Sequence, residues 1–94
     1  MIIRTVRHKG LERFLEDNDA RGIRSDLVSR IRAVLTVLLA ARDMEGVIGP
    51  PGWRIHPLIG NRQGAWSISV SGNWRITFTV DADEICDLNL EDYH

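Results

Sequence analysis

Residues 65–80 constrain the fold of this chain more than any other stretch. Large apolar residues alternate with small polar ones on both sides of the glycine-containing connection 71–73. Such period-two alternation around a short turn is typical of a β-hairpin. The bulky residues would share one face, namely Trp66, Ile68, Val70, Trp74, Ile76, Phe78 and Val80. The other face would carry small hydroxyl side chains and one cation, Arg75, so it could serve a purpose other than core packing.

A second apolar pattern predicts a long helix that packs on this hairpin. Apolar residues recur at helical spacing at Leu27, Val28, Ile31, Val34, Leu35, Leu38 and Leu39. Ser25 is a suitable N-cap, and Asp26 suits the positive end of the helix dipole, so the helix is expected from Asp26 to Asp43. Its apolar stripe needs a sheet to cover, and the tryptophan face of the hairpin supplies one.

The remaining segments complete an α+β domain over residues 1–94. Short apolar runs predict three further strands, at residues 2–6, 53–56 and 84–90. Apolar spacing predicts a short helix over 10–18, with Gly22 as a left-handed residue after its end. The expected order is β-α-α-β-β-β-β, with two helices from the N-terminal half packed on one face of a mostly antiparallel sheet.

Charge is distributed unevenly along the sequence. Residues 1–75 hold all 12 Lys and Arg against seven Asp and Glu, a net charge of +5. Residues 76–94 hold six acids and no Lys or Arg, a net charge of −6, so the whole chain has −1. Eleven of the 12 cations are arginine, which suits multi-donor contacts with phosphate or carboxylate. An ordinary arginine-rich, solvated surface would have the same composition.

Several classes of protein are not indicated. No apolar run is long enough to cross a membrane, and the N-terminus lacks the pattern of a signal peptide. The single Cys86 cannot form an internal disulfide, so a cytoplasmic location is expected. His8, His56 and His94 are far apart in the sequence, and no metal site or other cofactor is expected.

The residues that could support chemistry are His56, Arg75 and the C-terminal run Asp92-Tyr93-His94. Each of them alone is more simply explained as a structural or solvated residue. Together they supply what metal-free RNA cleavage needs: a base for the 2′-hydroxyl, a cation for the phosphate and an acid for the leaving oxygen. Histidine can serve as base or acid near neutral pH, and tyrosine can stack on a base. The division of acid and base roles between His56 and His94 stays open.

Motifs along the whole chain point to one family. They are Arg7-His8-Lys9-Gly10-Leu11, Ile55-His56-Pro57-Leu58 with Gly60, Trp66-Ser67-Ile68-Ser69-Val70, Asn73-Trp74-Arg75-Ile76-Thr77-Phe78 and the terminal Glu91-Asp92-Tyr93-His94. In this order and spacing the sequence resembles the HigB "killer protein" family of bacterial plasmid-maintenance toxins, within the RelE/ParE superfamily. The Ile55–Gly60, Asn73–Phe78 and terminal motifs are together quite specific.

The resemblance implies a RelE-like, microbial-ribonuclease-type fold. It implies a toxin that enters the ribosomal A site, cleaves translated mRNA without a metal ion and arrests growth. It also implies a HigA-type antitoxin partner with a helix-turn-helix domain. His56, Asp92, Tyr93 and His94 match active-site positions of the family, and Arg75 matches its phosphate-binding arginine. The other cations expected to contact RNA or phosphate are Arg7, Lys9, Arg54 and Arg62.

Two features depart from the family pattern. Ile59 stands where several members have lysine, although Arg62 in the next turn could substitute for that cation. The net charge of −1 is low for the family, and affinity for RNA grows with the number of cation–phosphate contacts. An alternative function therefore stays open. The chain could be a weakened or non-catalytic toxin-like protein that binds an antitoxin, or that inhibits another macromolecule in the manner of ParE.

Overall fold

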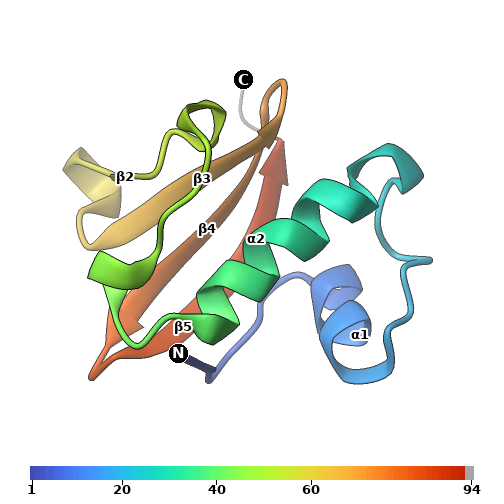
Figure 1. The fold of residues 1–94 in the computed structure, drawn as a ribbon, viewed down its shortest axis with the longest axis horizontal. Coiled ribbons are helices and arrows are strands. Elements are labelled where there is room, and N and C mark those ends of the chain that lie inside the picture. Colours follow the sequence, from blue (N-terminus) through green and yellow to red (C-terminus); the bar gives the residue numbers. More distant parts are fainter. Residues whose placement is uncertain (93–94) are drawn as a thin grey trace.

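Five strands form one sheet in the computed structural model of the chain, which describes residues 1–92 (Figure 1). In spatial order they are β1 (Ile2–Ile3), β5 (Glu84–Asp92), β4 (Trp74–Asp81), β3 (Ala65–Ser71) and β2 (His56–Pro57). β1 runs parallel to β5, and the other neighbours are antiparallel. The predicted mostly antiparallel α+β fold and its element order are therefore confirmed, including the β3–β4 hairpin.

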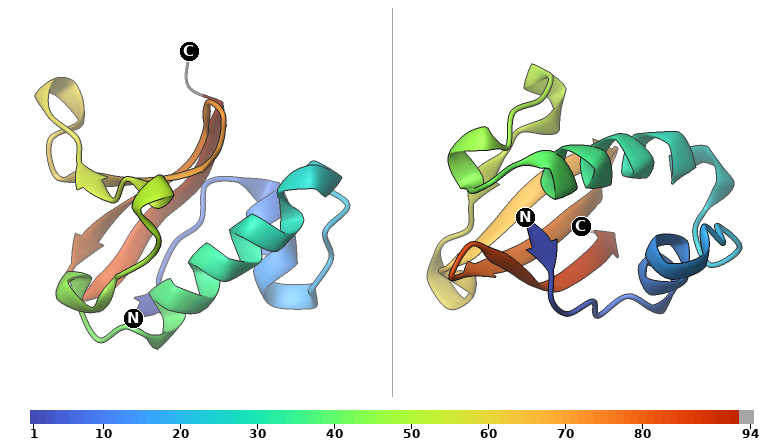
Figure 2. Two further views of the ribbon diagram at one scale, coloured as in Figure 1. Left: turned by 45° about the horizontal axis from the view of Figure 1, so that its top comes forward. Right: turned by 60° about the horizontal axis from the view of Figure 1, so that its bottom comes forward.

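Two helices cover one face of this sheet. α1 spans Lys9–Asp17 and α2 spans Val28–Ala40, and the views of Figure 2 show α2 crossing the sheet with α1 beside it. The predicted bounds of α2 were too wide at both ends. Ser25–Leu27 form a separate 3-10 turn, η1, without a side-chain cap, and the chain becomes extended at Ala41. The described helices include none that is long and apolar enough to cross a membrane.

The ends of α1 differ from the sequence-based prediction. The Nδ1 atom of His8 accepts a hydrogen bond of 3.2 Å from the backbone N–H of Leu11 and so caps the helix. Partial burial lowers the pKa of His8, which favours the neutral ring that this acceptor role requires. The left-handed residue at the end of α1 is Asn18, with φ of 53°, so the assignment of this conformation to Gly22 was wrong. Asparagine tolerates this region because its short side chain is polar.

Two predicted strands are shorter than the apolar runs suggested. The segment 53–56 is mostly not a strand, because Pro51–Trp53 form a 3-10 turn (η3) and Arg54 has a left-handed φ of 47°. Only His56 and Pro57 pair with β3. The N-terminal strand is likewise limited to β1, with an isolated bridge from Val6 to Leu88. Two further 3-10 turns occur, η2 at Met44–Gly46 and η4 at Gly60–Arg62.

The core lies between the helices and the apolar face of the hairpin. Ile68, Ile76 and Phe78 are almost completely buried there, together with Leu11, Leu27, Ile31, Val34 and Leu38 from the helical half. The apolar face of the hairpin is thus the packing surface that the sequence predicted. Trp66 and Trp74 are only partly buried and lie at the margin of the core. Arg24 packs over the ring of Trp74, 5.7 Å from its centroid, and covers that margin.

Candidate active site

On the face of the sheet that points away from the core, polar residues from four strands form a row across the sheet. His56 of β2 lies opposite Ser67 of β3, which lies opposite Thr77 of β4, which lies opposite Asn89 of β5. Residues paired across strands point their side chains to the same face. Ser67 and Thr77 are almost completely buried, although they are polar. This part of the polar face is therefore covered by neighbouring side chains.

The next row contains the predicted phosphate-binding residue. Ser69, Arg75 and Glu91 lie opposite one another across β3, β4 and β5. Arg75 is half-buried, and its Nη1 atom donates to the hydroxyl of Ser67, 3.5 Å away in the neighbouring row. The structure thus places Arg75 in the middle of the polar face, as the alternation in the hairpin predicted. A half-buried guanidinium is less screened by water than an exposed one, so its charge acts more strongly on a nearby anion.

Glu91 joins this face although it was not among the predicted site residues. It accepts two hydrogen bonds from Arg62, from Nη1 to Oε1 at 2.9 Å and from Nη2 to Oε2 at 2.6 Å. The hydroxyl of Thr77 also donates to Oε2. The pKa of Glu91 is lowered, chiefly by the hydrogen bonds from Arg62. Thr77 and the charge of Arg7 lower it further, while partial burial opposes the shift. Glu91 is therefore ionised at neutral pH and tied to two elements of the polar face.

A cleft of about 310 Å³ opens on this side of the molecule. Two of the predicted cations line it, Arg7 from the segment before α1 and Arg62 from η4. Its other lining residues are Asn61, Gln63, Ala65, Thr77, Phe78, Thr79 and Asp87. Two arginines beside hydroxyl and amide groups can bind a phosphate oxygen through several N–H donors. Among the described residues, Lys9 and Arg54 are exposed and do not line this cleft.

His56 is exposed at the edge of the polar face. Its Nδ1 atom lies 2.5 Å from the carbonyl oxygen of Arg54. A carbonyl oxygen can only accept, so we assign the proton to Nδ1, which leaves the lone pair of the neutral ring on Nε2. This arrangement presents a nitrogen that can take up a proton from another molecule.

The C-terminal run is divided by the register of β5. Asp92 lies opposite Trp74, so its Cβ points to the face that carries the helices, whereas Glu91 points to the face of Arg75. Tyr93 and His94 lie outside the described residues. Strict alternation from the buried Leu88 and Leu90 would have identified Glu91 as the acid of the polar face. Within residues 1–92 no cluster of three or more His, Cys, Asp or Glu is arranged to hold a metal ion.

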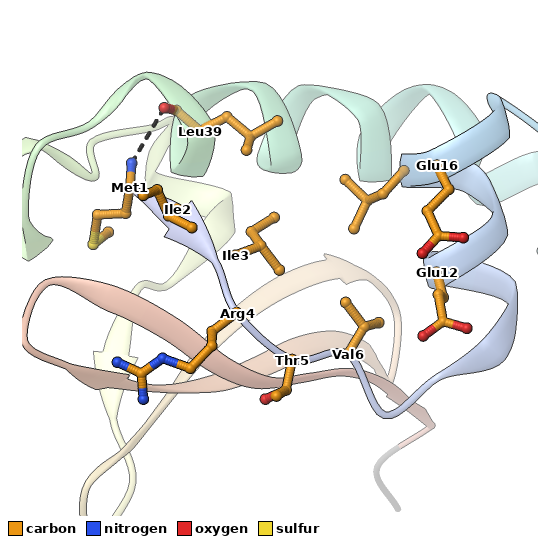
Figure 3. Close-up of a pocket in the computed structure, with 10 residues that line it drawn as sticks. Met1, Ile2, Ile3, Arg4, Thr5, Val6, Glu12, Glu16 and Leu39 are labelled. Carbon is orange, nitrogen blue, oxygen red and sulfur yellow. Dashed lines mark hydrogen bonds between the residues drawn. The ribbon is translucent and has the colours of Figure 1, made fainter.

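A larger groove, of about 910 Å³, lies at the edge of the sheet formed by β1 (Figure 3). Residues 1–6 form one wall, and Glu12, Leu15, Glu16 and Leu39 of the helices form the other. Ile2 and Leu39 expose 68% and 52% of their surface, and Glu12 and Glu16 lie side by side on α1. None of the predicted site residues within the described range 1–92 lines this groove, and it shares no lining residue with the polar cleft.

Comparison with known proteins assigns the family. Residues 4–94 match the model of the HigB-like toxins, described as the RelE-like toxin of the type II toxin–antitoxin system HigB. This chain belongs to the HigB-like toxin family. It is also 38% identical over 93 residues to Endoribonuclease HigB of Proteus vulgaris, a match that covers 99% of this chain and 100% of the relative. The family that the sequence motifs indicated is thereby confirmed.

Solved structures of other toxins share the fold of this HigB-like chain. YafQ from E. coli superposes with a TM-score of 0.62 at 11% identity, covering 96% of this chain and 92% of YafQ. A chain of the E. coli DinJ–YafQ toxin–antitoxin complex gives a TM-score of 0.60 at 11% identity, covering 98% of this chain and 93% of that chain. A chain of the YoeB–YefM complex from Staphylococcus aureus gives 0.55 at 19%, covering 100% and 99%. At such identities the likeness concerns the fold alone.

Proposed function

We propose that this HigB-like toxin is a ribosome-dependent endoribonuclease that cleaves translated mRNA in the ribosomal A site and so arrests growth. The observation that carries the proposal is the polar face of the sheet, where Arg75 lies beside the arginine-lined cleft and in the same face as His56. The name of the full-length relative from Proteus vulgaris supports the same activity. The toxin would act in the cytoplasm, where ribosomes are.

The arginines would stabilise the phosphate during cleavage. Attack of a 2′-hydroxyl on phosphorus adds negative charge to the non-bridging oxygens, and positioned cations lower the free energy of that transition state. Arg75 is held against Ser67, and Arg62 is held against Glu91, so both guanidinium groups are oriented before RNA binds. Arg7, which also lines the cleft, would contribute further positive charge. Lys9 and Arg54, both exposed, would contact RNA outside the cleft.

The histidines would carry the protons. The 2′-hydroxyl gives its proton to a base as it attacks, and the departing 5′-oxygen receives a proton from an acid. Nε2 of His56 is suited to one of these transfers because Nδ1 is directed at the carbonyl of Arg54. From the family resemblance, His94 would perform the other transfer, Asp92 would orient or tune one histidine, and Tyr93 would stack on a base or position the nucleophile.

The partner of the toxin would be a HigA-type antitoxin with a helix-turn-helix domain. We propose that an antitoxin segment docks in the groove at the edge of β1, where the strand has a free side and apolar residues are exposed. Edge strands readily pair with a strand of a partner. The carboxylates of Glu12 and Glu16 on the groove wall favour a segment that combines apolar with basic side chains.

Primer extension on mRNA from cells that express the chain tests this function. Cuts at fixed codon positions, which disappear when translation of that mRNA is blocked, are expected. Deletion of Tyr93 and His94 should remove both the cuts and the growth arrest. Growth arrest with intact mRNA, or with DNA damage, would instead favour the non-catalytic, ParE-like alternative.

A further inference from the structure

We infer that Glu91 is a positioning residue that holds Arg62 over the cleft for RNA cleavage. The inference rests on the proposed function, and it assigns a role to a residue outside the predicted active site. A carboxylate beside an RNA-binding cleft repels phosphate and should by itself weaken binding, so the presence of Glu91 there calls for a compensating role.

Arg62 needs an anchor because the segment that carries it is irregular. It ends η4, in the connection between β2 and β3, where Gly60 and Gly64 have φ values of +70° and +96°. A long side chain on such a connection has many accessible rotamers, and their loss on binding costs free energy. The two-contact pair with Glu91 restricts the guanidinium to one orientation before RNA arrives.

Glu91 is suited to anchor another side chain because it is itself fixed. It lies on β5, next to the central strand β4, and its side chain is only 24% exposed. The hydroxyl of Thr77, a buried residue of β4, donates to the same oxygen that receives Nη2 of Arg62. The carboxylate thus joins a regular, buried part of the sheet to an irregular segment 29 residues away. Sites built on regular elements hold their geometry better than sites built on loops.

The geometry also admits an opposite role, in which Glu91 occupies Arg62 and phosphate must displace it. In that case, removal of the carboxylate charge would increase RNA affinity and the cleavage rate. The positioning role requires a decrease. The two roles therefore differ in the sign of the effect of one isosteric substitution, Glu91→Gln.

The test is a double-mutant cycle on the purified toxin, with single-turnover cleavage of ribosome-bound mRNA as the readout. Glu91→Gln should slow cleavage about tenfold, because a misplaced charge-assisted contact costs that much in rate. Arg62→Ala should slow it at least as much. The double variant should be no slower than Arg62→Ala alone, because Glu91 would act only through Arg62. Glu84→Gln is the matched control, since Glu84 is also a β5 glutamate paired with an arginine, but its partner Arg4 does not line the cleft as Arg62 does.

The results of the cycle distinguish a failure of the proposed function from a failure of the positioning role of Glu91. An inactive wild-type toxin would refute the proposed function itself. An active wild type with an equally fast or faster Glu91→Gln variant would overturn the positioning role. So would additive losses in the double variant, which would indicate a general structural effect of Glu91. Denaturant unfolding of each variant shows whether a loss of rate follows from a loss of fold.

Discussion

Gly10 and Gly22 pack backbone against backbone where α1 begins and the chain turns toward α2. A Cβ atom on Gly22 would lie only 2.7 Å from the Cα of Gly10, and one on Gly10 would overlap the carbonyl group of Gly22. Neither backbone can move away easily, because Gly10 is buried beside Leu11, a residue of the core. The contact explains why both positions are glycine although neither has a positive φ.

Gly10→Ala should therefore destabilise the protein by about 1–3 kcal/mol, the usual cost of forcing atoms into a packed contact. Urea unfolding measures the change in free energy. Gly52→Ala is the control, because no atom lies within 4 Å of a Cβ at that position. It should stay within about 0.5 kcal/mol of wild type. Equal stability of Gly10→Ala and wild type would show that the segment adjusts without cost.

Arg75→Ala should abolish growth arrest and lower the cleavage rate by about a hundredfold or more, because a half-buried cation at the reacting phosphate is lost. The variant should remain folded, since Arg75 lies on the face of the sheet away from the helices. Cleavage of ribosome-bound mRNA and circular dichroism provide the two measurements. Arg42→Ala removes an exposed arginine just beyond α2 and should leave both unchanged. Full toxicity of Arg75→Ala would exclude this residue from the site.

The pair between Glu91 and Arg62 should make stability depend on acidic pH. The pKa of Glu91 is lowered in the folded state, chiefly by Arg62, so the pair stabilises the protein above the ordinary glutamate pKa. This contribution is lost as the pH falls through the lowered pKa. Glu91→Gln should cost about 1 kcal/mol at pH 7, and the difference from wild type should shrink toward pH 3. Urea unfolding at both pH values measures it, and a difference that does not depend on pH would contradict the assignment.

Replacing both groove carboxylates, Glu12→Lys with Glu16→Lys, should weaken antitoxin binding about tenfold or more by reversing the charge that a basic segment meets. Titration calorimetry with the purified antitoxin measures the affinity. Ribosome-dependent cleavage should be unchanged, because the groove is separate from the polar cleft. Glu45→Lys, at an exposed residue of η2, is the control for added charge. Unchanged affinity of the double variant would exclude this groove as the docking site.

Local patterns predicted much of this protein. Alternation on both sides of Gly72 predicted the hairpin, its two faces and the position of Arg75, and helical spacing between Leu27 and Leu38 predicted α2. Irregular backbone conformations could not be predicted from these patterns. Arg54 and Asp87 adopt positive φ values of 47° and 54°, which are uncommon for residues other than glycine, and no local sequence pattern indicates them. The bulge between Thr77 and Thr79 near Asp87 shifts the register of β5, so that Ile85 and Leu88 both face the core.

The sequence by itself determined the family, the α+β class and the division of the sheet into an apolar and a polar face. These follow from the order of residue types within short segments, where side-chain direction has a fixed period. The tertiary structure decided which polar residues meet. Arg62 and Glu91 are 29 residues apart, and their contact depends on the path of one irregular connection and on the register of β5. Alternation along β5 puts Glu91 rather than Asp92 on the polar face, and the pairing of β5 with β4 places it opposite Arg75.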